Sequence, residues 1–234
     1  MNKAKSLIAL SMLVAGATSV QAQDLDITVT NLTQGTYFTP IVTAAHSSDA
    51  SMFTVGEAAS AELQMMAEGG NISGLVGVLG TAGADVNENP AAGLLGPAAS
   101  TNYMLTNADG NDYLSITAMI LPTNDGFIGL NSWKIPEEAG TYTVYLNAYD
   151  AGTEANNELV ADGTGAPGVL GIPAAPGGFA GTGGTGVTTE EANTNIHIHR
   201  GNLGDDDLTG GKSDINNTVH RWLNPVAKVT IVVQ

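Results

Sequence analysis

The sequence predicts an all-β fold with one short helix. Two segments, 113–121 and 142–149, alternate between apolar and polar residues with the period of two that is typical of a half-buried strand. A cluster of turn-forming residues at 122–126 and a short return strand at 127–133 lie between them, so the chain is expected to run up, down and up again. A single substantial segment, 55–68, has the apolar spacing of a helix.

The first residues are expected to lie outside this fold. Two lysines precede an apolar run at 7–15, and a small-residue cleavage site ends at Ala22, which is the pattern of a secretory signal peptide spanning 1–22. Its removal would leave residues 23–234 as one domain that is secreted, in the periplasm or outside the cell. The apolar run is too short to cross a bilayer, so we expect no transmembrane segment.

The composition is strongly acidic. Seven Lys and Arg stand against 23 Asp and Glu, and removing the signal peptide takes away two of the lysines and no acid, which leaves five against 23 and a net charge of −18. Such a chain is repelled by nucleic acid and by anionic membranes, so neither is expected as a partner. Few lysines, many Gly, Ala, Thr and Asn, and an acidic charge are typical of a bacterial secreted protein.

The N-terminal part of the domain is expected to form two extended pieces. Residues 26–32 alternate and predict the first strand, with Ile27 and Val29 inward. Residues 36–43 form the second piece, and the segment around His46 is expected to be a loop.

The predicted helix has recognisable start and stop signals. Thr54 is a plausible N-cap with Glu57 three residues later, and a Gly-Gly pair follows residue 68. The next stretch, 71–101, is rich in Gly, Ala and Leu and is predicted to be a loop with short extended pieces.

The C-terminal part contains the longest irregular stretch, 156–195, which holds ten glycines between 163 and 186. We interpret it as a flexible excursion over the surface, with a lid over a ligand as the alternative. Residues 196–200 predict a strand with its two isoleucines inward and its two histidines outward. Residues 226–233 predict a closing strand in the centre of a sheet, because both of its faces are largely apolar.

Three carboxylates are predicted to meet at one end of the sheet. By strand parity, the loop at 122–126 and the loop after Tyr149 lie at the same end, which gathers Asp125, Asp150 and Glu154. Crowded carboxylates repel one another, and a hard divalent cation with six to eight oxygen ligands is the usual remedy. Solvated loop acids are the simpler alternative.

Two further features of these loops favour the cation. No Lys or Arg occurs at 122–133 or 135–199 to neutralise the acids. Gly152, in the Asp-Ala-Gly-Thr-Glu loop, would let the chain fold back so that both acids of this loop face one point.

The segment 119–154 resembles the N-terminal domain of the spondins, extracellular-matrix proteins of animals. That family has a proline loop with an Asp, followed by a strand that ends in D-A-G-T-D. Residues 44–53, A-A-H-S-S-D-A-S-M-F, are similar to the family's A-A-H-S-x-x-x-S-M-W, and residues 225–231 are similar to its last strand. The three blocks occur in the right order over nearly the whole mature chain.

The resemblance implies an eight-stranded antiparallel β-sandwich, similar to a membrane-binding C2 domain. It also implies Ca2+ binding through Asp125, Asp150 and Glu154, although Glu154 stands where the family has Asp. The implied function is extracellular binding or cell adhesion in a matrix rather than catalysis. The resemblance does not say whether the partner is a protein, a glycan or a lipid, nor what the oligomeric state is.

Two rival functions remain open from the sequence. His197 and His199, together with His220 or His46, are residues that could ligate a transition metal in an exported binding protein or enzyme. A structural subunit of an extracellular matrix or fibre is the other rival. The triplet Asp205–Asp207 is a weaker candidate for a second calcium site.

A hydrolase is not expected. His46 is followed by two serines and an aspartate, but neighbours in one loop do not easily reach the geometry of a catalytic triad. The sequence also has no G-x-S-x-G elbow.

Overall fold

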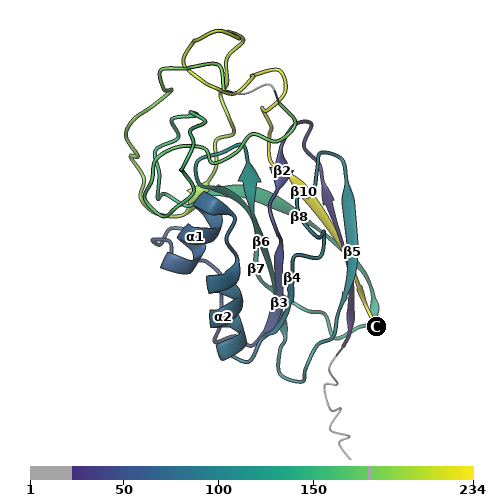
Figure 1. Ribbon diagram of the computed structural model, residues 1–234. Helices are drawn as coiled ribbons and strands as arrows, with labels where there is room; N and C mark the ends of the chain where they lie inside the picture. Colours follow the sequence, from purple (N-terminus) through teal and green to yellow (C-terminus); the bar gives the residue numbers. More distant parts are fainter. Residues whose placement is uncertain (1–22, 179–180) are drawn as a thin grey trace, which may run out of the picture.

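The computed structural model describes residues 23–178 and 181–234. The main element of this part of the chain is an antiparallel β-sheet (Figure 1). Eight strands follow one another in the order β4-β3-β6-β7-β8-β10-β1-β5, with β2 joining beside β6 and β9 beside β8. The strands are β1 (Leu25–Asn31), β2 (Tyr37–Phe38), β3 (Val42–His46), β4 (Asp85–Glu88), β5 (Ser100–Leu105), β6 (Tyr113–Leu121), β7 (Gly126–Lys134), β8 (Gly140–Asp150), β9 (His197–Ile198) and β10 (Ala227–Val233). The predicted signal peptide lies outside the described residues.

Strand β8 joins the two halves of the sheet. Its first part, from Gly140 to Leu146, pairs with β10, and its last part, from Asn147 to Asp150, pairs with β7. One half is therefore β4-β3-β6-β7 and the other is β8-β10-β1-β5. The outer strands of the two halves approach each other, since Asn87 Nδ2 donates to the carbonyl of Met104 at 3.3 Å. The predicted all-β antiparallel fold is confirmed, and β10 lies inside the sheet between β8 and β1 as expected.

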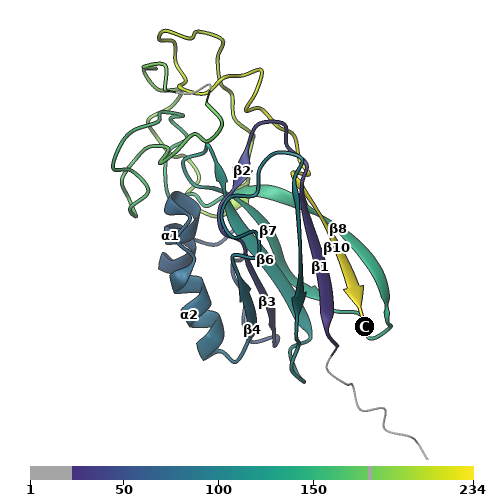
Figure 2. The same cartoon turned by 45° about the vertical axis from the view of Figure 1, so that its right-hand side comes forward.

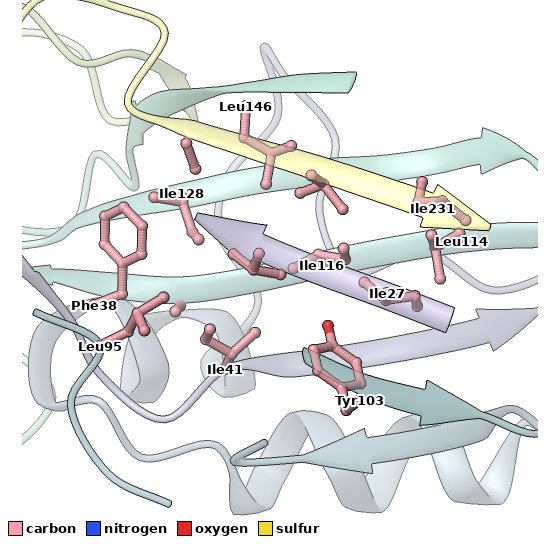
Figure 3. Close-up of a cluster of buried hydrophobic side chains, with 14 of the residues drawn as sticks. Ile27, Phe38, Ile41, Leu95, Tyr103, Leu114, Ile116, Ile128, Leu146 and Ile231 are labelled. Carbon is pink, nitrogen blue, oxygen red and sulfur yellow. The ribbon is translucent and has the colours of Figure 1, made fainter. Parts of the chain in front are cut away.

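The main core lies between the two halves (Figure 3). Ile27 and Ile231 reach it from one half, and Ile116 and Ile128 reach it from the other, all fully buried. Inward placement of alternate residues along β1, β6 and β10 is what the period of two predicts. Burial of these side chains is the main force that holds the halves together.

A second core lies between β3, β6 and β7 and two helices, α1 (Ala61–Gly69) and α2 (Ser73–Thr81), which cover one side of the molecule (Figures 1 and 2). Leu63 and Leu75 from the helices pack against Met119 and Phe127 from the strands. Strand β6 is consequently buried on both faces, so the expectation of a half-buried strand at 113–121 is wrong in that respect. The described residues contain these two helices, and neither is long and apolar enough to span a membrane.

Helix α1 begins later than the sequence predicted. Its N-cap is Ser60, whose hydroxyl accepts a hydrogen bond from the Leu63 N–H at 3.1 Å, and Thr54 does not cap it. The reason is tertiary: Gly56 N–H donates to the carbonyl of Ile196, and Ile196 N–H donates to the carbonyl of Glu57, both at 2.8 Å. This exchange with a distant segment keeps the chain before Ser60 out of the helix.

The second helix, α2, was not predicted, because three of its nine residues are glycine and glycine disfavours helices. One of these glycines, Gly74, serves packing. A Cβ added at Gly74 would lie 3.0 Å from Cγ of Glu62 on α1, so the small residue lets the helices approach closely. The rest of the stretch 71–101 holds β4 and the start of β5, in line with the expected short extended pieces.

The predicted strand at 196–200 is only partly correct. The paired part is β9, His197–Ile198, and the predicted faces are reversed at its end. Ile198 is 48% exposed, whereas the His199 side chain is buried against Trp222, with ring centroids 5.2 Å apart. The stretch 156–195 contains no helix or named strand among its described residues, as predicted.

Candidate functional site

Two loops meet at one end of the sheet, as strand parity predicts. Gly126, at the start of β7, pairs with Asp150, at the end of β8, and the Ala151 N–H donates to the carbonyl of Asp125 at 3.3 Å. The β6–β7 loop and the loop after β8 are thereby held side by side. Asp125, Asp150 and Glu154 are all buried at this end.

Asp125 uses only one of its two carboxylate oxygens. Oδ2 accepts from the backbone N–H of Thr153 at 2.8 Å, from the Thr153 hydroxyl at 3.2 Å and from the Glu154 N–H at 3.1 Å. Oδ1 is buried and has no hydrogen-bond partner. Burial raises the pKa of Asp125 to about 7, the negative charge of Asp150 adds to this, and the hydrogen bonds from Thr153 and Glu154 oppose it.

Glu154 repeats this pattern. Its Oε2 accepts from the Gly171 N–H at 3.0 Å and from Asn124 Nδ2 at 3.3 Å, while Oε1 is buried without a partner. Burial raises the pKa of Glu154 to about 8, and the charges of Glu68 and Asp125 raise it further against the two hydrogen bonds. The cluster therefore contains two buried carboxylate oxygens that no protein group satisfies.

Asp150 is satisfied by its own loop. Its Oδ1 accepts from the Gly152 N–H at 2.9 Å and its Oδ2 accepts from Asn156 Nδ2 at 2.7 Å. Gly152 has φ +69°, and a Cβ there would lie 2.7 Å from the carbonyl oxygen of Asn193. Only glycine fits this turn, in agreement with the prediction that Gly152 lets the loop fold back.

Two histidines face Asp150 from β9 and the residue after it. The distances from Asp150 Oδ2 are 3.9 Å to His197 Nε2 and 4.0 Å to His199 Nε2. His199 Nδ1 accepts from the Gly201 N–H at 2.9 Å, so in the neutral ring Nε2 carries the proton. Burial lowers the pKa of His199 to about 4, against the charge of Asp150, and Arg200 and His197 lower it further. His199 is therefore neutral at physiological pH.

Two residues of this region were missed by sequence reasoning. Asn124 donates to Asn157 Oδ1 at 2.9 Å and to Glu154, and its Oδ1 accepts from the Glu158 N–H at 3.2 Å. Glu68, in the last turn of α1, is fully buried and accepts from the Gly168 N–H at 2.7 Å. Asn124 was within reach of inference because it precedes Asp125 in the turn, whereas nothing in the sequence connects Glu68 to this end.

The donor set suits Ca2+ in charge and chemistry. A hard cation prefers oxygen ligands, which all three acids offer. Its positive charge would favour the ionised form of the buried acids whose pKa values are raised, and it would give the two unsatisfied carboxylate oxygens a partner. Among the described residues, no Lys or Arg side chain forms an ion pair with these three acids, and the basic side chains within 4.0 Å of them are the two histidines beside Asp150. The three side chains do not form a complete coordination site: in the described part of the chain, no three His, Asp or Glu side chains are arranged to hold a metal ion.

The other candidate metal ligands from the sequence, described next, are not arranged around one metal position among the described residues. His220 is buried, and its Nδ1 accepts from the Asn216 N–H at 3.1 Å. His46 ends β3 instead of lying in a loop, and its Nε2 lies 2.7 Å from Ser115 Oγ. Asp205 accepts the backbone N–H groups of Lys212 and Ser213 at 2.7 and 2.9 Å, and these bonds lower its pKa.

The buried pair of His46 and Ser115 has the contact of a nucleophile and a base but no access. Both residues are fully buried, and the Ser115 hydroxyl also contacts the Ser132 N–H at 2.8 Å. His46 Nδ1 is 2.8 Å from the carbonyl of Ser47. The arrangement ties β3, β6 and β7 together, which is a structural role.

A comparison with models of known protein families shows to which family the chain belongs. The sequence model of Spondin_N matches residues 30–161, more than half of the 234 residues. The chain belongs to the Spondin_N family. The matched range contains the β6–β7 loop and the loop after β8, so the Spondin_N region includes Asp125, Asp150 and Glu154. A search of curated proteins found no match. Spondin_N is a family of non-enzymatic, extracellular-type domains.

Proposed function

We propose that this Spondin_N protein is an exported domain for extracellular binding or adhesion, and that Ca2+ at the carboxylate cluster of Asp125, Asp150 and Glu154 fixes its loops. The observation that carries the proposal is the pair of buried oxygens without partners, Asp125 Oδ1 and Glu154 Oε1. A buried carboxylate that lacks a partner is costly, and a bound cation removes that cost. The predicted signal peptide and the family support export.

The residues would act in different ways. Asp125 and Glu154 would supply the free oxygens, and Asp150 would add charge while it holds the Gly152 turn. Calcium would supply the positive charge that lets three buried acids stay ionised together. Because Asp125 already binds the loop after β8 and Glu154 binds Gly171, neutralising their charge would stabilise both loops at this end.

The contacts argue against two of the three histidines of the transition-metal alternative, whereas His197 donates from Nδ1 to the Asn195 carbonyl at 2.8 Å and keeps the lone pair of its Nε2. His199 and His220 each use Nδ1 to accept a backbone N–H, which leaves the proton on Nε2 and no free lone pair for a metal. We also propose that the protein is not an enzyme, because it belongs to a family of non-enzymatic domains.

Thermal unfolding in EDTA and in excess CaCl2 tests the calcium proposal. A ligand that binds only the folded state at a hundredfold excess over Kd adds about 2.7 kcal/mol. For a domain of this size this is a rise in Tm of several degrees. Asp150→Asn, and the double substitution Asp125→Asn with Glu154→Gln, should remove most of the rise.

The matched control is Asp206→Asn, an exposed acid of the lone triplet, which should keep the full rise. Identical melting curves of the native protein in EDTA and in CaCl2 would overturn the proposal. So would a rise that Asp206→Asn abolishes and Asp150→Asn does not.

A further inference from the structure

The outer face of the half-sheet β5-β1-β10-β8 is an ordered array of side chains. Alternate residues of these strands point into the core, and the others point outward in three register rows across the four strands. In the order β5, β1, β10, β8, the first row is Met104, Asp26, Val232 and Thr141, the second is Asn102, Thr28, Thr230 and Thr143, and the third is Ser100, Thr30, Lys228 and Tyr145. We call these twelve side chains the hydroxyl face. The helices lie on the other side of the molecule (Figure 2).

The hydroxyl face is neutral overall. It holds one acid, Asp26, and one base, Lys228, so its net charge is zero. Eight of the twelve side chains carry a hydroxyl or an amide group. The central row is entirely of this kind, with Asn102, Thr28, Thr230 and Thr143 side by side.

Hydrogen bonds within the face hold part of it in place. Asn102 Nδ2 donates to Thr28 Oγ1 at 2.9 Å, and Thr30 Oγ1 lies 2.8 Å from Ser100 Oγ. Threonine is also restricted at χ1 by its branched Cβ. Side chains that are already ordered lose less conformational entropy when a ligand binds. Each hydroxyl still has donor or acceptor capacity left for a ligand.

The size of the face suits an extended ligand. Strands lie about 4.8 Å apart and alternate residues of a strand about 6.7 Å apart, so the array measures roughly 14 Å in each direction. Tyr145 stands at one corner and is 60% exposed. An aromatic ring with a hydroxyl offers an apolar surface and a polar group at the same place.

From these observations we propose that the hydroxyl face binds a neutral polysaccharide chain. Sugar rings present C–H surfaces that would pack on Tyr145, and their hydroxyls would exchange hydrogen bonds with the central row. Acidic polymers are repelled by the negative protein, while a neutral polymer is not. A protein partner is less well matched, because the large side chains Tyr145 and Met104 lie at opposite corners of the face and the central row, where an interface would have its apolar anchors, is polar.

This inference names a ligand class for the extracellular binding role proposed above, and to that extent it rests on that role. It does not depend on calcium, since none of the face residues belongs to the carboxylate cluster. The calcium response and the glycan response can therefore fail separately.

Retention of the mature protein on insoluble polysaccharides tests the inference. The panel is cellulose, chitin, β-1,3-glucan and mannan, which are neutral, with alginate coupled to agarose and assayed in EDTA as the acidic comparison. The native protein should bind at least one neutral polymer and bind alginate more weakly. Tyr145→Ala should weaken that binding about tenfold, and Thr143→Glu should do the same by placing a charge in the central row.

The matched control is Thr189→Glu, which adds the same charge at an exposed threonine in the long loop. It should bind like the native protein, and all three variants should keep the native Tm in EDTA, which shows that they are folded. Retention on none of the neutral polymers, stronger retention on alginate, or equal retention of all variants would each overturn the inference. Sedimentation showing a dimer that Thr143→Glu dissociates, without glycan retention, would assign the face to self-association instead.

Discussion

The backbone N–H of Thr153 donates to Asp125 Oδ2 at 2.8 Å, which ties together two loops that are 28 residues apart in the sequence. The same oxygen accepts the Glu154 N–H. Asp125 is thus both a structural acceptor and, through its free Oδ1, a candidate metal ligand. Substitutions that remove the acceptor and substitutions that remove only the charge should therefore have different effects.

Asp125→Ala should strongly destabilise the fold, because it leaves the Thr153 and Glu154 donors unpaired. We expect a loss of about 3 kcal/mol in the free energy of unfolding, measured with urea in EDTA. Asp125→Asn retains an accepting oxygen and removes a buried charge, so in EDTA at pH 8 it should be at least as stable as the native protein. It should nevertheless lose the calcium response. Equal stability of the two variants would contradict this division of roles.

The pKa values of the cluster predict how stability depends on pH without metal. Asp125 and Glu154 have folded pKa values of about 7 and about 8, above their ordinary values, so the folded state holds more protons than the unfolded state. The free energy of unfolding in EDTA should therefore fall as the pH rises from 6.5 to 8.5. In excess CaCl2 the fall should largely disappear. A rise in stability over this range in EDTA would show that the acids are not strained by burial.

His199 has the opposite effect at lower pH. Its folded pKa of about 4 lies below the ordinary value near 6.5, so the unfolded state holds more protons between these values. Stability from this residue is lost as the pH falls from 6.5 towards 4. His199→Asn still offers an acceptor to the Gly201 N–H and does not titrate there. It should lose less stability than the native protein between pH 6.5 and 4.5, measured by urea unfolding.

The start of α1 can be tested by two single substitutions. Ser60→Ala removes the hydroxyl that caps the helix and should cost about 1 kcal/mol in the free energy of unfolding. Thr54→Ala changes an exposed residue outside the helix and should cost almost nothing. Urea unfolding of both variants decides the matter. A larger effect at Thr54 would place the helix start where the sequence pattern suggested.

Glu158 holds the long C-terminal loops together. Its carboxylate accepts the N–H groups of Leu203 and Gly204 at 2.6 and 2.8 Å and the Ser213 hydroxyl at 2.7 Å. Glu158→Ala should therefore expose the segment 203–213 to proteases, seen as faster cleavage there by mass spectrometry. Glu190→Ala, at an exposed acid, is the control and should leave the rate unchanged. Equal rates in both variants would mean that other contacts hold this segment.

Much of the sheet could be predicted from the sequence because alternation is a local property. Strands β6, β7 and β8 lie where the apolar pattern places them, within about two residues at each end. Their parity then determines that Asp125 and Asp150 lie at the same end, since each antiparallel strand reverses the direction of the chain. Gly152 was also predictable, because the loop after β8 has to turn sharply.

What only the tertiary structure decided depends on contacts between distant segments. The chain before Ser60 is not helical because Gly56 and Glu57 exchange hydrogen bonds with Ile196, about 140 residues later. His199 turns inward because Trp222 and Asp150 meet it there, although strand alternation placed it outside. Local propensities differ by about 1 kcal/mol or less per residue, so burial and long-range hydrogen bonds override them at such positions.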